Sequence, residues 1–465
     1  MKSILFFDDF LIHRGAHVER RFHTPQWQEE FAYTDRSSPY GMGYASVVAA
    51  PGGGYYLYYV CLSGEETSDE HGSTIVCMAT SDDGFTWEPM PTGVAPDGLP
   101  EHVLLSGSPK PAGWWVVRDT NPDTQEGRYL TTNSPILRDP TGSGLVEVPS
   151  VLLDSADGRT WNVIPGAEFL PHHSDTCNCL VYNPIKNRYQ ITIRRRWGER
   201  RVFQVESADL TEWTAPHPVL HPSPIDPPST HFYGMPQFYM PSAGLFVGFL
   251  WLQHMPYNDI MGGPVTTEYA YSYDGDLWNR THTVAMPRRE PGCFGAGSMY
   301  GTAMVEREAD TIVYAVARVE EHHAIPRIIE SGKQSAVLLS GTLRKHGFVG
   351  LVSDRGRGEI TTECLRLDRP EITINVNAPL GGVRVQLCDT GYRPLPGCTY
   401  ADCREIQGDH LSADVVWGDG VAFREIVAGS QWLRIQVELE HAEIFSIDTE
   451  CAVAINPKAP VRRDL

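Results

Sequence analysis

The chain has 465 residues, with 38 Lys and Arg against 58 Asp and Glu, so its formal net charge is −20 at pH 7. This acidic balance argues against nucleic acid or an anionic membrane as the main partner, because both repel an acidic surface. It is compatible with a neutral substrate such as a sugar. Hydrophobic residues make up 41 % of the chain and charged residues 21 %, which is ordinary for a protein that buries a core.

The N-terminal segment MKSILFFDDF has too short an apolar run for a secretory signal, and no run of about 18 apolar residues could span a membrane. The ten cysteines show no CxxC pair and no Cys/His zinc spacing. Cys177 and Cys179 are expected to be packed thiols, because residues two apart share one face of a strand. We therefore expect a cytoplasmic, reduced protein.

Pairs of apolar and aromatic segments predict strands along the first three quarters of the chain. Their ranges are 44–48 with 55–59, 114–117 with 128–130, 179–182 with 189–193, 235–239 with 245–250, and 301–305 with 311–316. The motif S-x-D-G-x-x-W follows at 81–87, 155–161 and 272–278, at 207–213 with Leu210 in place of glycine, and in degenerate form at 344–348.

In this motif, Asp is expected to cap backbone N–H groups of a hairpin turn while Gly adopts a positive φ. The Trp indole then packs between neighbouring sheets. Five such units of about four strands, arranged radially, predict a five-bladed β-propeller.

From about residue 356 the pattern changes to period-two alternation of apolar and polar residues. It is clearest at 372–377, 383–387, 415–417 and 433–439. Alternation of this kind indicates half-buried antiparallel strands. We therefore expect an all-β protein with a propeller domain over 1–355 and a C-terminal antiparallel β-sandwich over 356–465.

This order of modules, with the segments 232–236, 271–275 and 382–385, resembles the five-bladed β-propeller glycoside hydrolases. These are the invertase/levansucrase and arabinanase/β-xylosidase families, and the likeness is to a bacterial invertase-like branch with a C-terminal β-sandwich. The resemblance implies a furanoside- or pyranoside-cleaving enzyme with its site at the mouth of the central channel. The sequence departs from the invertase pattern in lacking a WMNDPNG-like run, and Asp175 stands where a Glu-Cys pair is expected.

Glycoside cleavage requires two carboxyl groups across the scissile bond. In a propeller the inner strands start around the channel mouth and the second strands return to it. By this topology the candidate catalytic residues are Asp175, Glu320, Asp35 and Glu268, with Asp175 preferred. The structural alternatives are a turn cap for Asp175, an ion pair for Glu320, a loop turn for Asp35 and a solvated strand edge for Glu268.

The same topology predicts substrate-binding residues at the mouth. They are His173, Arg194, His231, Tyr233, Trp251, His254, Arg318 and His322. The histidines fit hydrogen bonding to sugar hydroxyls, a metal site or solvated loops. We assign no metal and no cofactor from the sequence, while a cation bound in the channel stays an open alternative.

The function expected from these residues is an exo-acting glycoside hydrolase on short oligosaccharides or glycosides, with fructosides or arabinosides favoured. The alternatives are a non-catalytic carbohydrate-binding propeller and a metal-assisted sugar-active enzyme that uses the mouth histidines. The expected partner is a small carbohydrate, with no nucleic acid or membrane, and self-association is left open. The sugar, the linkage and the stereochemical outcome are not readable from the sequence.

Overall fold

The computed structural model describes residues 3–36, 41–63, 73–106, 111–138, 145–174, 177–194, 200–256, 262–321 and 335–454. Within these residues the regular structure is almost entirely β, and the exceptions are the 3-10 turn η1 (Glu29–Phe31) and the helix α2 (Val421–Ala428). The all-β prediction is therefore confirmed. No helix in the described ranges is long and apolar enough to cross a membrane.

Most strands before residue 345 pair into five antiparallel groups. The first group contains β5 (Met42–Ala49), β6 (Tyr55–Ser63), β7 (Ser73–Ser81), β8 (Glu88–Pro89) and β9 (Val103–Leu105). The second contains β10 (Trp115–Arg118), β11 (Tyr129–Asn133), β14 (Ser150–Ser155) and β15 (Asn162–Leu170), with the small hairpin β12 (Leu137–Arg138) and β13 (Leu145–Val146) beside it in sequence. The third contains β16 (Cys179–Asn183), β17 (Arg188–Ile193), β18 (Val202–Ser207) and β19 (His217–Leu220).

The fourth group contains β20 (Thr230–Gly234), β21 (Gln237–Met240), β22 (Leu245–His254), β23 (Val265–Ser272) and β24 (Asn279–Met286). The fifth contains β25 (Ser298–Glu306), β26 (Asp310–Arg318), β27 (Ala336–Arg344) and β4 (Gln26–Trp27). A single parallel bridge, Val265 with Ser298, joins the fourth group to the fifth. The outermost strand of the fifth group is supplied by the N-terminal segment, because β4 pairs with β27.

The inner strands of the groups lie next to one another in a closed order. Strand β5 neighbours β10 and β25, β16 neighbours β10 and β21, and β22 neighbours β25. A cavity of about 460 Å³ is lined by 46–49, 115–118, 180–182, 237–239 and 303–306, which come from all five groups. Residues just after the inner strands, such as Thr120, Pro184 and Pro241, line it too. The inner strands therefore run in one direction, and their first residues surround the opposite end, which we call the strand-start end.

In the first four groups the repeated motif forms the turn that follows β7, β14, β18 and β23, respectively. Asp83 accepts hydrogen bonds from the backbone N–H of Phe85 and Thr86 at 2.7 and 2.8 Å, and Gly84 has φ 81°. Asp157, Asp209 and Asp274 make the same pair of bonds. Backbone hydrogen bonds from Glu212 and Thr211 hold the pKa of Asp209 at about 2.

Side chains of one group also hold the turn of the next. The Tyr58 hydroxyl donates to the Gly158 carbonyl at 2.7 Å, and Asn183 donates to the Asp274 carbonyl at 2.7 Å. The Tyr314 hydroxyl of the fifth group donates to the Gly84 carbonyl of the first at 2.8 Å. The last of these bonds connects the end of the series to its beginning.

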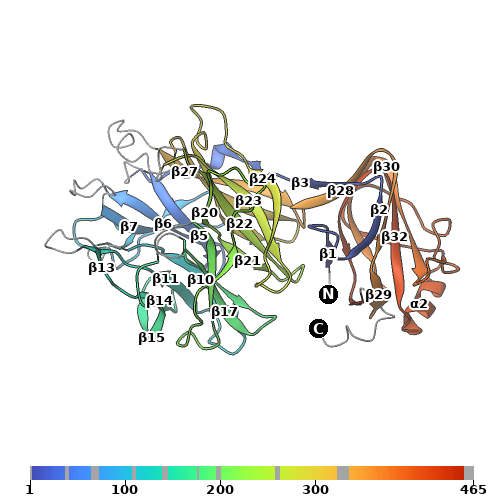
Figure 1. The fold of residues 1–465 in the computed structure, drawn as a ribbon, viewed down its shortest axis with the longest axis horizontal. Helices are drawn as coiled ribbons and strands as arrows, with labels where there is room; N and C mark the ends of the chain where they lie inside the picture. The colour runs from blue at the N-terminus through green and yellow to red at the C-terminus, as the bar shows by residue number, and fades with distance from the viewer. Residues whose placement is uncertain are drawn as a thin grey trace.

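The remaining strands form one nine-stranded sheet, drawn at the right of Figure 1. It contains β1 (Ser3–Leu5), β2 (Ile12–Ala16), β3 (Glu19–Phe22), β28 (Val349–Thr362), β29 (Cys364–Leu367), β30 (Thr373–Asp389), β31 (Ile406–Asp414), β32 (Leu433–Asp448) and β33 (Cys451–Ala454). Strands β1, β2 and β3 thus pair with C-terminal strands although they begin the chain. The boundary between 355 and 356 stays a prediction.

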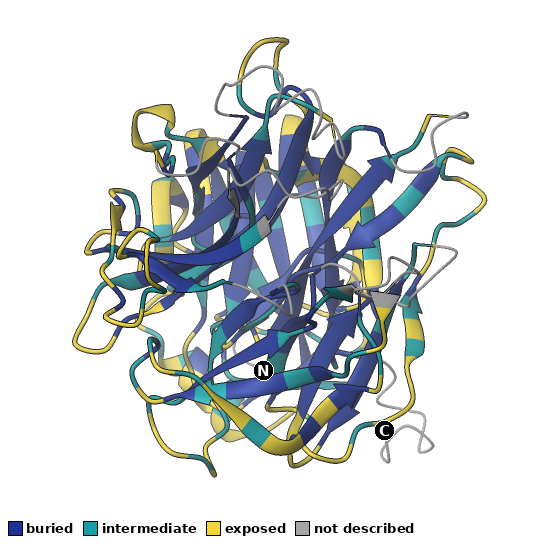
Figure 2. Ribbon diagram, turned by 90° about the vertical axis from the view of Figure 1, so that its left-hand side faces the viewer, coloured by how far each residue is buried: buried dark blue, intermediate teal, exposed yellow. Residues whose placement is uncertain are grey.

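The apolar core is continuous from the fourth and fifth groups into this C-terminal sheet. Phe6, Phe7 and Leu11 belong to the same buried cluster as Phe249 and Val437. Figure 2 shows buried residues along most strands and exposed residues on the loops and rims. All ten cysteines are free thiols, so the prediction that Cys177 and Cys179 are packed thiols is confirmed.

Candidate functional site

Aromatic side chains from three strand groups meet at the strand-start end. Tyr44 of β5 stacks on Trp251 of β22 with ring centroids 5.7 Å apart, and its hydroxyl lies 2.9 Å from that of Tyr233. Tyr300 of β25 meets Trp251 edge to face at 5.3 Å. The Trp251 indole is fully buried and donates to the Gly301 carbonyl at 2.7 Å. Trp251, predicted to bind substrate, therefore belongs to a packed aromatic cluster and has no exposed ring face.

Two guanidinium groups lie against this cluster. The Arg194 guanidinium is 4.6 Å from the centre of the Tyr233 ring, and that of Arg200 is 5.4 Å from it. Burial and the nearby Arg200 lower the pKa of His231. A cation held over an aromatic face is favourable when partly desolvated, so these contacts fix two guanidinium groups against the aromatic cluster.

The other predicted binding residues that are described also lie at ends of strands facing the strand-start end. His173 precedes β16, with Nδ1 2.8 Å from the Ser134 carbonyl, and His254 ends β22, with Nε2 3.2 Å from Thr266 Oγ1. Burial and Arg288 lower the pKa of His254. Arg318 ends β26. Asp175 and His322 lie outside the described residues.

Glu320 lies just after β26, and its Oε2 atom is buried with no hydrogen-bond partner among the residues that the structure describes. The Nε atom of Arg318 is also buried and has no partner within the described part of the chain. The loop from Gly295 to Gly297 packs onto this segment, because both glycines donate their N–H to the Arg318 carbonyl at 3.0 Å. A Cβ on Gly297 would lie 2.1 Å from the carbonyl of Glu320. The backbone carrying Glu320 is thus held closely while a carboxylate oxygen is left unpaired, which is costly unless a ligand uses it.

Glu268 has a different environment inside the fourth group. Its Oε1 and Oε2 atoms accept hydrogen bonds from Arg280 at 3.1 and 2.8 Å, and Oε1 also accepts from the His282 N–H at 2.8 Å. Arg280 donates in addition to Asp226 at 2.7 Å. Glu268 is only 1 % exposed. It is a buried ion-pair residue, not the solvated strand-edge residue considered as its alternative role.

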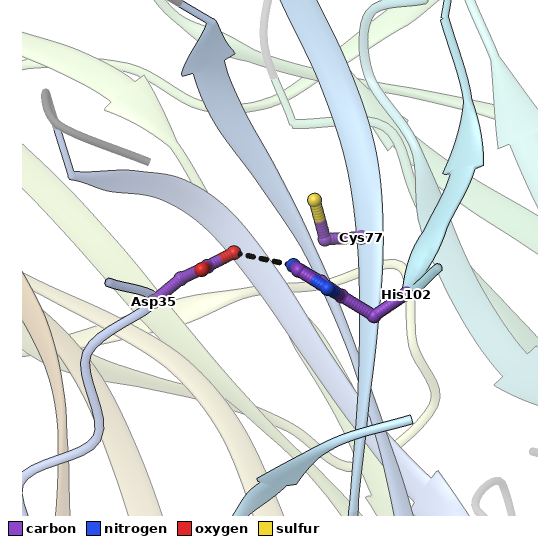
Figure 3. Close-up of side chains that lie close together, drawn as sticks. All are labelled: Asp35, Cys77 and His102. Atoms are coloured by element: carbon purple, nitrogen blue, oxygen red, sulfur yellow. Dashed lines mark hydrogen bonds and ion pairs between the residues drawn. The ribbon is translucent and has the colours of Figure 1, made fainter. Parts of the chain in front are cut away.

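Asp35 is likewise buried, at 2 % exposure. Its Oδ2 atom lies 2.9 Å from the Tyr59 hydroxyl and 2.9 Å from His102 Nε2. Figure 3 shows His102 facing the Asp35 carboxylate with the Cys77 thiol beside them. The Cys61 thiol is 3.9 Å from the same oxygen. The side chains around Asp35 come from β6, β7 and the segment before β9, so sequence reasoning could not group them without the strand register.

No family model matches the chain, and no curated protein matches it. The chain is similar to solved structures that include glycoside hydrolases. A Bombyx mori GH32 β-fructofuranosidase is 13 % identical, with 88 % of this chain and 90 % of that chain covered and a TM-score of 0.44. A structure from a GH130 study of hydrolases that target β-1,2 mannosidic linkages is 15 % identical, with 73 % and 96 % covered and a TM-score of 0.44.

An N-acetylgalactosamine deacetylase from F. plautii is 14 % identical, with 69 % of this chain and 94 % of that chain covered and a TM-score of 0.48. Its activity differs from that of the other two. Likenesses this distant do not identify the activity of this chain, so its chemistry has to be inferred from its own residues.

Proposed function

We propose that this chain is a glycoside hydrolase whose reaction takes place at the strand-start end. In this proposal the five strand groups are the blades of a five-bladed propeller, and the C-terminal sheet is a β-sandwich onto which β1, β2 and β3 dock. The closed order of the inner strands and the bond from Tyr314 to the Gly84 carbonyl support the ring. The substrate is a short oligosaccharide or glycoside, with furanosides favoured.

The observation that carries the proposal is the buried, unpaired oxygen of Glu320. A glycosidase needs one carboxyl group to protonate the leaving oxygen and a second to act as nucleophile or to activate water. We assign Glu320 as one of the pair and Asp175 as the other. Asp35 and Glu268 fit less well, because their carboxylate oxygens already bind neighbouring side chains in the core.

Donor groups beside Glu320 and elsewhere at the strand-start end support a polar, uncharged substrate. Arg318 offers an unpaired Nε donor two residues away, and Arg194 and Arg200 lie over Tyr233. These donors suit hydrogen bonds to sugar hydroxyls, while the positive charge that builds on the sugar ring during cleavage is left to the carboxylates. The net charge of −20 is also acceptable for a neutral sugar.

The test is hydrolysis of sucrose, short fructo-oligosaccharides and nitrophenyl arabino-, galacto- and xylosides by the purified chain. Glu320→Gln should lower kcat by about 10²–10⁴-fold, as expected for loss of a general acid or base. Its matched control is Glu321→Gln, since Glu321 is the exposed neighbour and should stay within about twofold of the native rate.

No turnover of any substrate, or equal losses in both variants, would contradict the proposal. Sugar-dependent thermal stabilisation without turnover would instead support a non-catalytic carbohydrate-binding propeller. Asp175→Asn should reproduce the loss of Glu320→Gln if the two residues act as a pair.

A further inference from the structure

A buried set of mixed donor atoms lies on one face of the first strand group, shown in Figure 3. One carboxylate oxygen of Asp35, the Sγ atom of Cys77 and a ring nitrogen of His102 lie within 4.8 Å of one another. Cys61 adds a second thiol, 3.9 Å from Asp35 Oδ2. A carboxylate, an imidazole and one thiol thus converge where little water reaches, and the Cys61 thiol lies beside the carboxylate.

Strand register explains why these residues converge. In the β6–β7 pair Tyr59 faces Cys77 and Cys61 faces Ile75, so Cys61 and Cys77 are diagonal neighbours on one face. His102 comes in from the other edge of β7, because its carbonyl accepts the Met78 N–H and Val103 pairs with Cys77. Asp35 reaches the same face from the segment before β5.

We propose that Asp35, Cys61, Cys77 and His102 bind one zinc ion in a closed, structural site. Thiolate, imidazole and carboxylate are the ligands that zinc takes in four-coordinate sites. Zinc–ligand bonds of about 2.0–2.3 Å place tetrahedral ligands roughly 3.3–3.8 Å from one another. The spacing of 3.9 Å between Cys61 and Asp35 is already close to this, and that of 2.9 Å between His102 and Asp35 has to widen slightly.

Zinc binding at this site releases protons and involves no change of oxidation state. Both thiols lose a proton to solvent as they bind, and His102 binds through unprotonated Nε2 after giving up its hydrogen bond to Asp35. The Tyr59 hydroxyl, which donates to Asp35 at 2.9 Å, stays in place and orients the carboxylate. The Tyr33 hydroxyl lies 3.0 Å from that of Tyr59 and extends the network.

The consequence is a link between distant parts of the first group. The ion would tie the segment before β5 to β6, β7 and the start of β9, next to the junction where Tyr33 bridges to Leu338 of the fifth group. Its role is therefore to stabilise the ring near its closure. None of the four ligands is part of the proposed Glu320 site, so this inference stands or falls separately from the proposed function.

The test starts with elemental analysis of the full chain purified without chelators, where we expect about one zinc per chain. The metal-depleted protein is then titrated with Co²⁺. Coordination by two thiolates in a tetrahedral site should give a thiolate-to-cobalt charge-transfer band and intense visible bands at one equivalent. Zinc should displace the cobalt and abolish both features.

Variants assign the ligands. Cys77→Ser and His102→Gln should lose the zinc and the cobalt spectrum, whereas Cys179→Ser, a matched variant at another fully buried thiol, should keep both. If the ligand variants do not fold, the cobalt titration of the native chain decides alone. Absence of zinc together with no charge-transfer band, a Cys61–Cys77 disulfide in the purified chain, or equal metal loss in Cys179→Ser would overturn the proposal.

Discussion

The buried network of Arg280, Glu268 and Asp226 allows a quantitative prediction about stability. Arg280 donates to Glu268 twice and to Asp226 once, and its guanidinium lies 4.7 Å from the centre of the Phe232 ring. The side chains of Arg280 and Glu268 are only 6 % and 2 % exposed. Arg280→Gln would leave two buried carboxylates without their cation.

Breaking a buried ion pair by removing one partner costs about 3–5 kcal/mol, because the remaining charge is uncompensated. The His282 N–H still donates to Glu268 and Gln can donate one bond, so we expect Arg280→Gln to cost about 3–4 kcal/mol near pH 7. Glu268→Gln should cost less, because Arg280 keeps Asp226. Arg280→Lys should fall between them, since an ammonium group cannot bind Glu268 in the same bidentate way.

The pKa of Asp226 determines how the stability lost in Arg280→Gln depends on pH. Burial by itself raises the pKa of Asp226, but hydrogen bonds from Arg280 and Ser223 outweigh it and the pKa lies below its usual value. A lowered pKa in the folded state stabilises the fold above the unfolded value of about 3.9, and this stabilisation is lost as the pH falls through the folded pKa. Without Arg280 only burial remains, so Asp226 takes up a proton more readily in the variant.

The difference in unfolding free energy between native chain and Arg280→Gln should therefore be largest near pH 7 and shrink towards pH 4. Urea unfolding followed by tryptophan fluorescence at several pH values measures it. A loss below about 1 kcal/mol, as for a surface pair, or a loss that does not change with pH, would refute the reasoning.

Three further predictions concern the repeat turns and the junction with the C-terminal sheet. Tyr314→Phe should cost about 1–3 kcal/mol, because the buried Gly84 carbonyl loses its hydroxyl donor. Tyr58→Phe should cost less, because the Trp161 indole still donates to the Gly158 carbonyl at 3.2 Å. Tyr56→Phe, whose hydroxyl has no hydrogen bond within the described ranges, should cost least, and equal effects of all three in urea unfolding would argue against the turn-holding role. Leu210 is buried and has φ 71°. Leu210→Gly should relieve about 1–2 kcal/mol of backbone strain but lose about 2–5 kcal/mol of packing, so we expect a net loss of stability. A higher melting temperature of the variant would show that the strain dominates. Burial lowers the pKa of His346 despite the nearby Asp448, so the fold should lose stability as the pH drops below about 6.5. His346→Gln should therefore weaken the dependence of the melting temperature on pH between pH 6.5 and 5. The same dependence in the variant as in the native chain would contradict this.

Much of the fold could be predicted because the repeated turn is a local structure. Asp83 caps N–H groups two and three residues ahead, and Gly84 supplies the positive φ, so the motif is readable within seven residues. Four copies at similar spacing then imply stacked sheet units. The all-β class and the free, packed thiols follow from the same kind of short-range pattern.

The candidate site was less predictable, because the environment of a carboxylate depends on residues far along the chain. Topology led us to place Arg194, Tyr233 and Trp251 at one end, but it could not tell that Trp251 is enclosed by Tyr44 and Tyr300. Nor could it tell that Glu320 keeps a buried unpaired oxygen while Glu268 is bound by Arg280.

By itself the sequence determined the turns, the strand pattern and the acidic, sugar-compatible character of the protein, because these depend on neighbouring residues and on composition. Only the tertiary structure decided that β4 completes the fifth group, that β1 to β3 join strands more than 300 residues later, and that Asp35 meets Cys61, Cys77 and His102. The physical reason is strand pairing. An edge strand offers the same N–H and C=O groups to any partner, and the choice among partners is made by the buried surface that the whole fold creates.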